Sequence, residues 1–504
     1  MESMDKLVSS QSLPYALYRT EQVREFDRLA IEEFKIAGVL LMQRAGQRAF
    51  DLLRKLWPQA KHFTIICGAG NNAGDGYVVA QLAKRAGLHC SLFYLQSPEK
   101  LQGDAKTKAK EWLECGGICQ IFQSLPQKTD LIVDALLGTG LTRDVSGSFA
   151  QVIEQINQHQ APVLAIDIPS GLDSDTGCIR GSAVKADATI SFIGLKQGLF
   201  TADGPEMCGR VHFDTLQIPA KIYSRQILSV RRLDYSKVSQ NITPRSRNSH
   251  KGDFGKLLII GGNQGYSGAA RMAGEAALRS GAGLVAIASH PAHAAMLNIG
   301  RPELMCHSIA SADELQPLLN WADVLVLGPG LGQNKWGQQL FEAACDSKLP
   351  MVVDADGLNL LTKQPQTRDN WILTPHPGEA ARLLGSDIAT LQQDRFKTLN
   401  KLTARFGGVV ILKGAGSLIG DNSAKRPGLC SAGNPGLATA GSGDVLSGLL
   451  GALMAQGLNI YDAAETAVCI HATAADKIAV VSGERGLLAS DLLPVIRELL
   501  NPEE

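Results

Sequence analysis

The sequence has no excess of charge of either sign and no long uninterrupted apolar run. Lysine and arginine together number 49, aspartate and glutamate also number 49, and the formal net charge at pH 7 is zero. A chain without net charge has no overall field to attract nucleic acid or an anionic membrane. The most apolar stretch, 436–453, is broken by Asp444, Ser447 and several glycines, whereas a membrane span needs about 18 consecutive apolar residues. We therefore expect a soluble protein whose partners are small molecules, not nucleic acids or membranes.

Paired cysteine motifs are also lacking. The closest two of the ten cysteines, Cys115 and Cys119, have CxxxC spacing and not the CxxC spacing of zinc and redox motifs. The first 22 residues are polar and lack the apolar segment of a secretory signal. Reduced thiols in the cytoplasm are the expectation that fits both observations.

The length of 504 residues exceeds the roughly 250–300 at which a single core stops growing, so two domains are expected. Short apolar runs alternate with longer amphipathic stretches in both halves, which predicts an α/β protein in which each domain is a mainly parallel sheet covered by helices. The predicted strands are FTIIC, LIVDALLG, VLAIDIPSG and ATISFIGL in the first half, and KLLIIGGN, GLVAIAS, DVLVLGPGLG, MVVDADGL, WILTPHPGE and GVVILKGAGS in the second.

A basic segment with little helical periodicity separates the two halves. We assign residues 1–220 to the first domain, 221–250 to a linker and the entry to the second, and 235–504 to the second domain. A nucleic-acid patch is the alternative interpretation of the basic residues. Interleaved aromatic residues are nearly absent from this segment, so a solvated linker is favoured.

The glycine-rich stretch GAGNNAGDG, Gly68 to Gly76, follows a predicted strand and precedes a predicted helix over 77–86. Backbone N–H groups exposed by glycines can bind phosphate in this setting. Farther along, Asp134 and Asp167 each end a strand, and Ser170 follows shortly after. Strand ends meet at one edge of a parallel sheet. Their oxygens could surround a monovalent or divalent cation, the carboxylates could transfer protons, or they could simply cap helices.

GAGNNAGDG, DALLGTGLTRD and AIDIPSGLDSDTG, in this order, resemble the epimerase domain of the NAD(P)H-hydrate repair enzymes, which is Rossmann-like. The resemblance covers about residues 17–220. It implies that potassium is held by Asn72, Asp134 and Ser170, and that Asp167 contacts the substrate. It further implies that the hydrated nucleotide is bound by Asn71, Asn72, Ala73, Gly74 and Asp75, and by Gly138, Thr139, Gly140, Leu141, Thr142, Arg143 and Asp144. Ala73 stands where the family usually has glycine, so we expect backbone strain there if the position needs a positive φ.

In the second half, AGSGDVLSG, Ala440 to Gly448, predicts a glycine turn that opens onto a helix with Asp444 in its first turn. Phosphate can sit against the N–H groups of such a turn while Asp444 takes a proton from a hydroxyl. Lys413 begins a second turn, KGAGS, after another strand. His376 lies between two prolines, with Glu379 three residues later; Glu379 could bind magnesium through water or simply stabilise a helix N-terminus. We interpret His471, among alanines, as a core residue.

AGSGD resembles the anion-hole and base motif of ribokinase-like kinases. Together with KGDFGKLLIIGG, YSGAA, GPGLG, TPHPGE and KGAGS, it is similar to the ADP- or ATP-dependent NAD(P)H-hydrate dehydratases over about residues 235–500. The resemblance implies that Asp444 approaches the substrate and that Gly443 touches the nucleoside of the phosphoryl donor. It assigns the hydrated nucleotide also to Ala270, Gly330 and His376, and the donor phosphates to Lys413, Gly414, Ala415, Gly416 and Ser417.

Taken together, the two resemblances imply repair of hydrated NADH and NADPH by an epimerase and a dehydratase in one chain, with Asp167 and Asp444 as catalytic residues. The fusion resembles the bacterial form, which implies ADP as donor, with ATP as the alternative, and we expect a homo-oligomer. Two rival functions remain. The second half could be a vitamin-type alcohol kinase that releases a phosphorylated product, and the first half could be a nucleotide-sensing or protein-binding module without catalysis.

Overall fold

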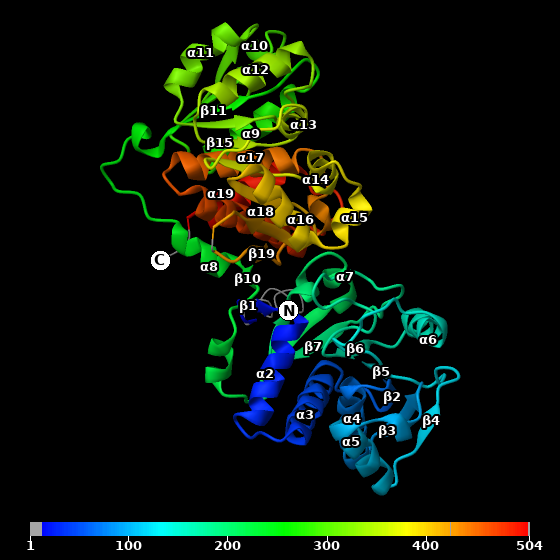
Figure 1. Cartoon of the computed structure of the whole chain (residues 1–504). Coiled ribbons are helices and arrows are strands. Elements are labelled where there is room, and N and C mark those ends of the chain that lie inside the picture. The colour runs from blue at the N-terminus through cyan, green and yellow to red at the C-terminus, as the bar shows by residue number, and fades with distance from the viewer. Residues whose placement is uncertain (1–12, 424, 502–504) are drawn as a thin grey trace. The chain divides into compact units, whose positions relative to one another are not determined.

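The computed structural model describes residues 13–423 and 425–501. This part of the chain forms two compact units that divide between Arg231 and Arg232, which we call the N-terminal unit and the C-terminal unit (Figure 1). Among the described residues, no helix combines the length and the apolar character needed to cross a bilayer.

The N-terminal unit is built on a seven-stranded sheet of order β4-β3-β2-β5-β6-β7-β9, in which all neighbours are parallel. The strands are β2 (His62–Cys67), β3 (His89–Tyr94), β4 (Cys119–Ile121), β5 (Leu131–Ala135), β6 (Val163–Ile166), β7 (Ala188–Phe192) and β9 (Arg210–Asp214). Two short strands, β1 (Ala16–Tyr18) and β8 (Leu195–Lys196), pair in parallel, and β10 (Val230–Leu233) pairs antiparallel to β1. The strands predicted in the first half are confirmed.

Helices cover both faces of this sheet because side chains alternate along each strand. Ile65 of β2 faces a core formed with α2, α3, α4 and α5, whereas the adjacent Ile66 faces a smaller core formed with α6. The helices of the unit are α2 (Thr20–Glu32), α3 (Gly38–Leu56), α4 (Asn71–Arg85), α5 (Gly103–Glu114), α6 (Gly147–Gln158) and α7 (Gly204–Cys208).

The glycine-rich stretch differs from its prediction. The helix expected over 77–86 begins earlier, at Asn71, so that only Gly68 to Gly70 form a turn. Asparagine and glycine are poor helix formers, but tight packing overrides this preference: a Cβ on Gly74 would lie 2.3 Å from the Sδ atom of Met42 in α3. Ala73 is buried inside the helix and is not among the residues with positive φ. The expected strain at Ala73 is therefore wrong.

The C-terminal unit contains strands in the order β13-β12-β11-β14-β15-β16-β17-β18-β19, parallel as far as β17 and antiparallel beyond it. They are β11 (Lys256–Ile260), β12 (Leu284–Ser289), β13 (Met305–Ser308), β14 (Val324–Leu327), β15 (Met351–Val353), β16 (Trp371–Leu373), β17 (Val409–Leu412), β18 (Ser417–Gly420) and β19 (Gly428–Cys430). The strands predicted in the second half are confirmed.

Small residues allow close helix packing on one face of this sheet. Buried residues of α9, α17, α18 and α19 form one core with strand residues such as Leu257 and Val326. A Cβ on Gly448 of α17 would lie 2.1 Å from the carbonyl oxygen of Ala273 in α9, so only glycine permits this approach. The helices are α8 (Tyr235–Val238), α9 (Ser267–Arg279), α10 (Ala294–Leu297), α11 (Ala312–Trp321), α12 (Lys335–Asp346), α13 (Asp356–Lys363), α14 (Pro377–Leu384), α15 (Ile388–Gln392), α16 (Arg395–Phe406), α17 (Ser442–Ala455), α18 (Ile460–Ser482) and α19 (Leu492–Leu499).

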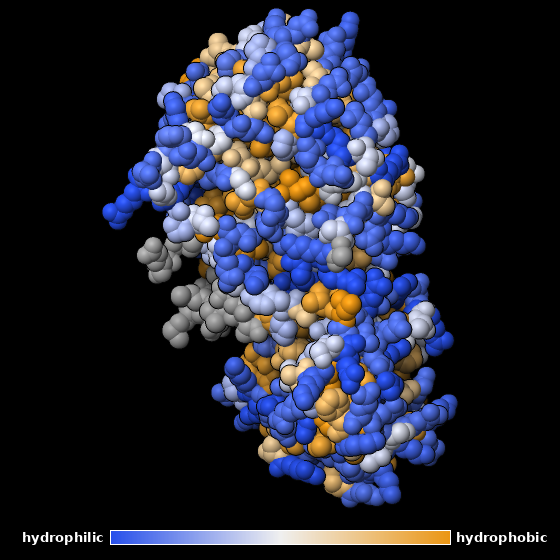
Figure 2. Space-filling model, turned by 60° about the vertical axis from the view of Figure 1, so that its left-hand side comes forward, coloured by the Kyte–Doolittle hydropathy of each residue, from blue (hydrophilic) through white to orange (hydrophobic). Residues whose placement is uncertain are grey.

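The outer surface is mainly hydrophilic on the face shown in Figure 2, with apolar residues interspersed. Large apolar side chains that are exposed include Ile118, Ile227 and Val481. Scattered exposed apolar residues of this kind are ordinary for globular proteins.

Candidate active sites

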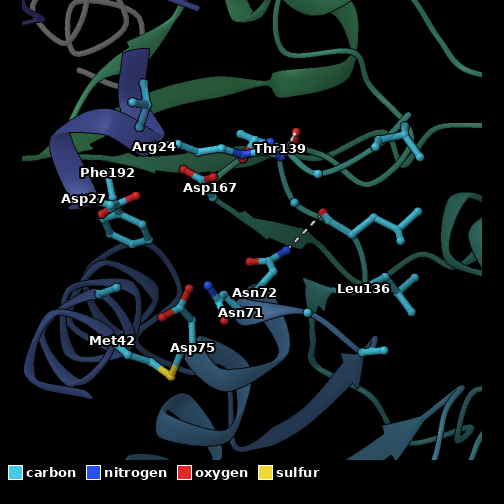
Figure 3. A pocket seen from close by; sticks show the side chains of 18 of the residues that line it. Arg24, Asp27, Met42, Asn71, Asn72, Asp75, Leu136, Thr139, Asp167 and Phe192 are labelled. Atoms are coloured by element: carbon cyan, nitrogen blue, oxygen red, sulfur yellow. Dashed lines mark hydrogen bonds between the residues drawn. The ribbon is translucent and has the colours of Figure 1, made fainter. Parts of the chain in front are cut away.

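A pocket of about 860 Å³ lies at the carboxyl ends of the parallel strands in the N-terminal unit (Figure 3). The segments after β2, β5 and β6, which the sequence predicts to meet, all line it. The predicted residues along its wall are Asn71, Asn72, Asp75, Gly138, Thr139, Gly140, Leu141, Thr142, Arg143, Asp144 and Asp167. Ala73 and Gly74 instead face the helix packing, and are not among the lining residues. The volume is sufficient for a large part of a nucleotide.

The turn after β2 can adopt its path only with glycine at its start. A Cβ on Gly68 would lie 1.8 Å from the carbonyl oxygen of Leu136, whereas a Cβ on Gly70 would meet nothing within 4 Å. The close approach of Gly68 brings the β2–α4 turn against the segment after β5. The two predicted binding segments are thereby held side by side.

Asp134, Ser170 and Asn72 form a buried oxygen-rich cluster beside the pocket. Asp134 Oδ2 accepts from the Ser170 N–H at 2.8 Å, and its Oδ1 accepts from the Ser170 hydroxyl at 2.6 Å. The Asn72 Nδ2 group donates to the carbonyl oxygen of Leu137 at 3.0 Å. Asn72 Oδ1 is buried without a hydrogen-bond partner among the described residues. Burial raises the pKa of Asp134 to about 6, although its hydrogen bonds from Ser170 oppose this. The helix-cap alternative does not apply to Asp134, which lies within β5.

Asp167 follows β6 in a left-handed backbone conformation, with φ of 68°. Such a conformation is costly for a residue other than glycine and is common at functional sites. Its N–H donates to the Ile190 carbonyl oxygen at 2.7 Å, and its carboxylate forms an ion pair with the ammonium of Lys196. Neighbouring β7 and β8 thus hold Asp167 at the pocket wall.

Four charged residues of this pocket are absent from the prediction: Arg24, Asp27, Asp104 and Lys196. Asp27 of α2 has its pKa raised to about 6 by burial and by the charge of Asp167, with Lys196 opposing. Burial and the charges of Asp167 and Asp27 raise the pKa of Asp75 well above its ordinary value. Asp27 lies one residue after buried Phe26 and four after buried Val23, and Lys196 directly follows buried Leu195. A charged residue at such apolar positions is the signal that could have indicated them.

In the C-terminal unit, the start of α17 has the predicted geometry. Gly441 has φ of 87°, the helix begins at Ser442, and Asp444 lies in the first turn. Nε2 of His471 in α18 lies 3.0 Å from the Ser442 carbonyl oxygen, and burial lowers the pKa of His471 to about 4. The core position expected for His471 is confirmed, and its ring also supports the beginning of α17.

Lys413 at the end of β17 lies beside this helix start. Its Nζ atom is 3.0 Å from Asp354 Oδ1, and the Ser447 hydroxyl of α17 donates to Asp354 Oδ2 at 2.7 Å. A Cβ on Gly443 would lie 3.5 Å from both Lys413 Nζ and Asp354 Oδ2. The structure therefore brings together the KGAGS turn and the first turn of α17, as predicted.

The charged groups in this cluster shift one another's pKa values. Burial and the negative charge of Asp354 raise the pKa of Asp444 to about 7, with Lys413 opposing. Although burial acts in the other direction, Lys413 and the Ser447 hydroxyl hold the pKa of Asp354 below its ordinary value. Asp444 is thus poised to exchange a proton near neutral pH.

His376 and Glu379 cap α14. The His376 N–H donates to Glu379 Oε2 at 2.8 Å, and His376 Nδ1 accepts from the Gly378 N–H at 3.0 Å. Glu379 Oε2 is also 4.0 Å from Lys413 Nζ. Burial raises the pKa of Glu379 to about 7. Glu379 thus lies in the first turn of α14 and bonds its N-cap residue, and the same side chain faces Lys413.

Ala270 lies in the first turn of α9, and Gly330, in the segment after β14, packs against the start of that helix. Ala270 is buried, and Gly330, with φ of 58°, packs against Tyr266 and Ala269. A Cβ on Gly441 would lie 2.4 Å from Met272 Sδ, so α9 and α17 begin side by side. All predicted segments of the second site therefore converge.

Asp354 and Arg395 were not predicted in the second site. Asp354 belongs to the predicted strand segment MVVDADGL, but nothing in the sequence indicates that it pairs with Lys413. The buried guanidinium of Arg395 donates to the carbonyl oxygens of Leu412 and Gly416 at 3.2 Å each, and so fixes the KGAGS turn. Among the residues that the structure describes, no group of three His, Cys, Asp or Glu side chains is arranged to hold a metal ion.

Comparison with known proteins matches residues 257–498 to the NAD(P)H-hydrate dehydratase family and residues 39–198 to the YjeF-related protein N-terminus family. The chain is 46% identical over 488 residues to the bifunctional NAD(P)H-hydrate repair enzyme Nnr of Coxiella burnetii, which covers 96% of this chain and 99% of that protein. It is 44% identical over 496 residues to the enzyme of the same name from Escherichia coli K12, covering 98% of this chain and 95% of that protein.

Among solved structures, a ribokinase-like superfamily protein from Enterococcus faecalis aligns with a TM-score of 0.50 and 27% identity, covering 55% of this chain and 96% of that one. The ribokinase-like fold expected for the second domain is thus confirmed. With relatives matched at this identity over nearly their whole length, the chain belongs to the family of bifunctional NAD(P)H-hydrate repair enzymes.

Proposed function

We propose that the chain repairs hydrated NADH and NADPH at two separate active sites. The N-terminal unit interconverts the R and S hydrates, and the C-terminal unit dehydrates the S hydrate to NAD(P)H while ADP is converted to AMP and phosphate. The observation that carries the dehydratase assignment is the placement of Asp444 at the start of α17, beside Lys413 and the KGAGS turn.

In the dehydratase site, Asp444 accepts the proton of the ring hydroxyl as that oxygen attacks the terminal phosphate of the donor. Hydroxide is a poor leaving group, and phosphorylation converts it into phosphate, which departs as the dihydropyridine is restored. The main-chain N–H groups of Gly441 to Gly443 stabilise charge on the transferred group. Lys413 and the turn from Gly414 to Ser417 bind the phosphates, with Gly443 against the nucleoside.

The remaining predicted residues bind substrate and cation. Ala270, Gly330 and His376 contact the hydrated nucleotide. The single buried carboxylate of Glu379, already bonded to the His376 N–H, fits a magnesium ion held through water, because magnesium retains much of its hydration shell. Magnesium neutralises donor phosphate charge in such reactions. We favour ADP as the donor, with ATP as the alternative.

In the epimerase site, the hydrated nucleotide occupies the 860 Å³ pocket and contacts the segments 71–75 and 138–144. Asn72, Asp134 and Ser170 would hold potassium. The buried, unpartnered Asn72 Oδ1 and the all-oxygen character of the cluster fit a hard monovalent cation. The ion would supply a fixed positive charge near the substrate. Asp167, held at the pocket wall, is the proposed catalytic residue.

The two rival functions are less well supported. An alcohol kinase would leave a stable phosphorylated product, whereas the family matched by residues 257–498 is a dehydratase. A sensing module without catalysis would not need the carboxylates Asp27, Asp75 and Asp167 around one pocket. Product analysis and epimer exchange, respectively, separate these alternatives.

The test uses the full chain with a mixture of R and S hydrates of NADH and either ADP or ATP. Both epimers should be consumed, the dihydronicotinamide absorbance should recover, and free phosphate should be released. Asp167→Asn should leave the R hydrate behind while the S hydrate is still dehydrated. A phosphorylated product without recovered NADH would contradict the dehydratase proposal, and unchanged exchange of epimers would remove Asp167 from the mechanism.

We also propose a cytoplasmic location and a homo-oligomeric state. All ten cysteines lie within the described residues and all are free thiols, which fits a reducing compartment. Light scattering of the purified protein would test the oligomeric state.

A further inference from the structure

Lys196 lies at the wall of the pocket, but its side chain is almost completely buried. Only 1% of its side chain is exposed. Besides the ion pair with Asp167, its Nζ atom donates to the Ser191 hydroxyl at 3.1 Å and to the Phe192 carbonyl oxygen at 3.2 Å. An ammonium group has three N–H donors, so these three partners use all of them. With its N–H donors occupied in this way, Lys196 acts on a bound molecule chiefly through Asp167.

Three carboxyl groups converge on the space beside this lysine. Asp27, Asp75 and Asp167 all line the same pocket, and Figure 3 shows their side chains around one opening. They come from α2, from α4 and from the end of β6. The charged residues that line the pocket are Arg24, Asp27, Asp75, Asp104, Arg143, Asp144, Asp167 and Lys196.

Close carboxyl groups in one partly buried pocket do not all ionise together. Lys196 forms an ion pair with only one of the three, Asp167. Asp27 and Asp75 form no ion pair with this lysine and are left to carry a proton. Asp75, which lies in the proposed nucleotide-binding segment 71–75, is the one assigned here, in keeping with its raised pKa. Two titratable groups whose environments drive their pKa values apart are the usual arrangement for a base and an acid in one site.

We propose that Asp167 and Asp75 are the base and the acid of the epimerase site, and that Lys196 is the positioning residue that assigns them these roles. This proposal rests on the epimerase function proposed above. It adds Lys196 to that function and gives Asp75, already in the proposed binding segment 71–75, the role of a second proton-transfer group.

The chemistry of the substrate requires both a base and an acid. Hydration of an enamine double bond places the hydroxyl on the ring carbon next to nitrogen, so the hydrate is a cyclic hemiaminal. On ring opening, Asp167 takes the hydroxyl proton and the carbon–oxygen bond becomes a carbonyl. The carbon–nitrogen bond breaks with its electron pair remaining on nitrogen, which receives a proton from Asp75.

Rotation about the adjacent carbon–carbon bond presents the opposite face of the carbonyl. Ring closure then reverses the step: nitrogen attacks carbon and returns its proton to Asp75, and the oxygen takes the proton back from Asp167. Both residues recover their starting states, and nothing is oxidised or reduced.

The test compares Lys196→Met with Lys108→Met in the full chain. Lys108 is also a buried lysine of the N-terminal unit, 3.0 Å from Glu111, but it does not line the pocket. Dehydration of the S hydrate by the C-terminal unit serves as an internal control, and thermal melting reports folding. Epimer exchange is measured over a range of pH.

We expect Lys196→Met to lower kcat for exchange by about 10²-fold or more with KM little changed, and to move the acidic limb of the pH profile to higher pH. Lys108→Met should retain kcat and the profile. In an Asp167→Asn background, Lys196→Met should cause little further loss, because Lys196 acts through Asp167. Asp75→Asn should lower kcat by about 10²–10⁴-fold and remove the alkaline limb.

A wild-type rate and acidic limb in Lys196→Met would overturn the role of Lys196, as would a fully additive loss in the double variant. If Lys196→Met fails to fold, Asp75→Asn decides, since an unchanged alkaline limb there contradicts the assignment of the acid. A wild-type chain that does not exchange the epimers at all would instead refute the epimerase function itself.

Discussion

Replacing Asp444 by asparagine should remove dehydration while making the C-terminal unit more stable above neutral pH. Asparagine keeps the size of the side chain but cannot accept the hydroxyl proton, so the rate of nucleotide-dependent dehydration should fall by about 10²–10⁴-fold. Because the pKa of Asp444 is about 7, only about one molecule in ten has the ionised base at pH 6. The wild-type rate should therefore fall close to tenfold per unit below pH 7.

The stability change follows from the same shift. In the folded chain this carboxyl titrates near 7 instead of the ordinary 3.8, so the folded state binds more protons than the unfolded state between these two values. Folding stability is consequently lost as the pH rises through this window, and the full penalty applies above pH 7. At 1.36 kcal/mol per pKa unit, the shift can lower the free energy of unfolding by at most about 4 kcal/mol. Solvent screening of this partly exposed group reduces the gain expected for asparagine to about 1–2 kcal/mol.

The assay is calorimetry of wild type and Asp444→Asn at pH 4 and pH 8, with dehydration and epimer exchange measured on the same samples. The variant should melt higher at pH 8, melt close to wild type at pH 4, retain exchange and lose dehydration. Near-normal dehydration would refute the general-base role. A variant that is equally destabilised at both pH values would refute the claim that burial of this charge is costly.

Three further predictions follow from named contacts. Asp354→Asn removes the charge that holds Lys413, so calorimetric titration should show weaker ADP binding and denaturation should show a loss of about 3 kcal/mol; unchanged affinity would argue against Lys413 as a phosphate ligand. Asn72→Ala removes the unpartnered oxygen, so epimer exchange should need several-fold more potassium while dehydration is unaltered, and an identical potassium titration would reject the site. Gly68→Ala places a Cβ 1.8 Å from a carbonyl oxygen and should unfold or strongly destabilise the N-terminal unit. Gly70→Ala, with open space around it, should change the free energy of unfolding by less than about 1 kcal/mol. Equal melting temperatures of the two glycine variants would contradict the packing argument.

Much of the fold could be predicted because it depends on local pattern. Buried parallel strands are continuous apolar runs, and FTIIC, LIVDA and VLAI could be identified by that property alone. The turn residues after them could be placed at one sheet edge because parallel strands share a direction. The helix start at Asn71 could not be predicted, because the packing of Gly74 against Met42 of α3 decides it and no local preference encodes that contact.

The same distinction applies to the sites. Asp444 and Lys413 belong to short glycine-bearing motifs, so their chemistry is visible in sequence. Asp27, Lys196 and Asp354 act through partners far away in the chain: Lys196 is 29 positions from Asp167, and Asp354 is 59 from Lys413. A lone charged residue is most often solvated, and only the fold shows that these three are not.

Each unit contains a lysine–aspartate ion pair, but the member that is buried differs between the two units. In the N-terminal unit the lysine is buried, at 1% exposure, and the aspartate is 20% exposed; in the C-terminal unit the lysine is 21% exposed and the aspartate 4%. The buried member of each pair holds and polarises the other, more exposed member. An exposed carboxylate suits proton transfer from a hydroxyl, whereas an exposed ammonium suits phosphate. The orientation of each pair thus agrees with an epimerase that handles protons and a dehydratase that handles a phosphoryl group.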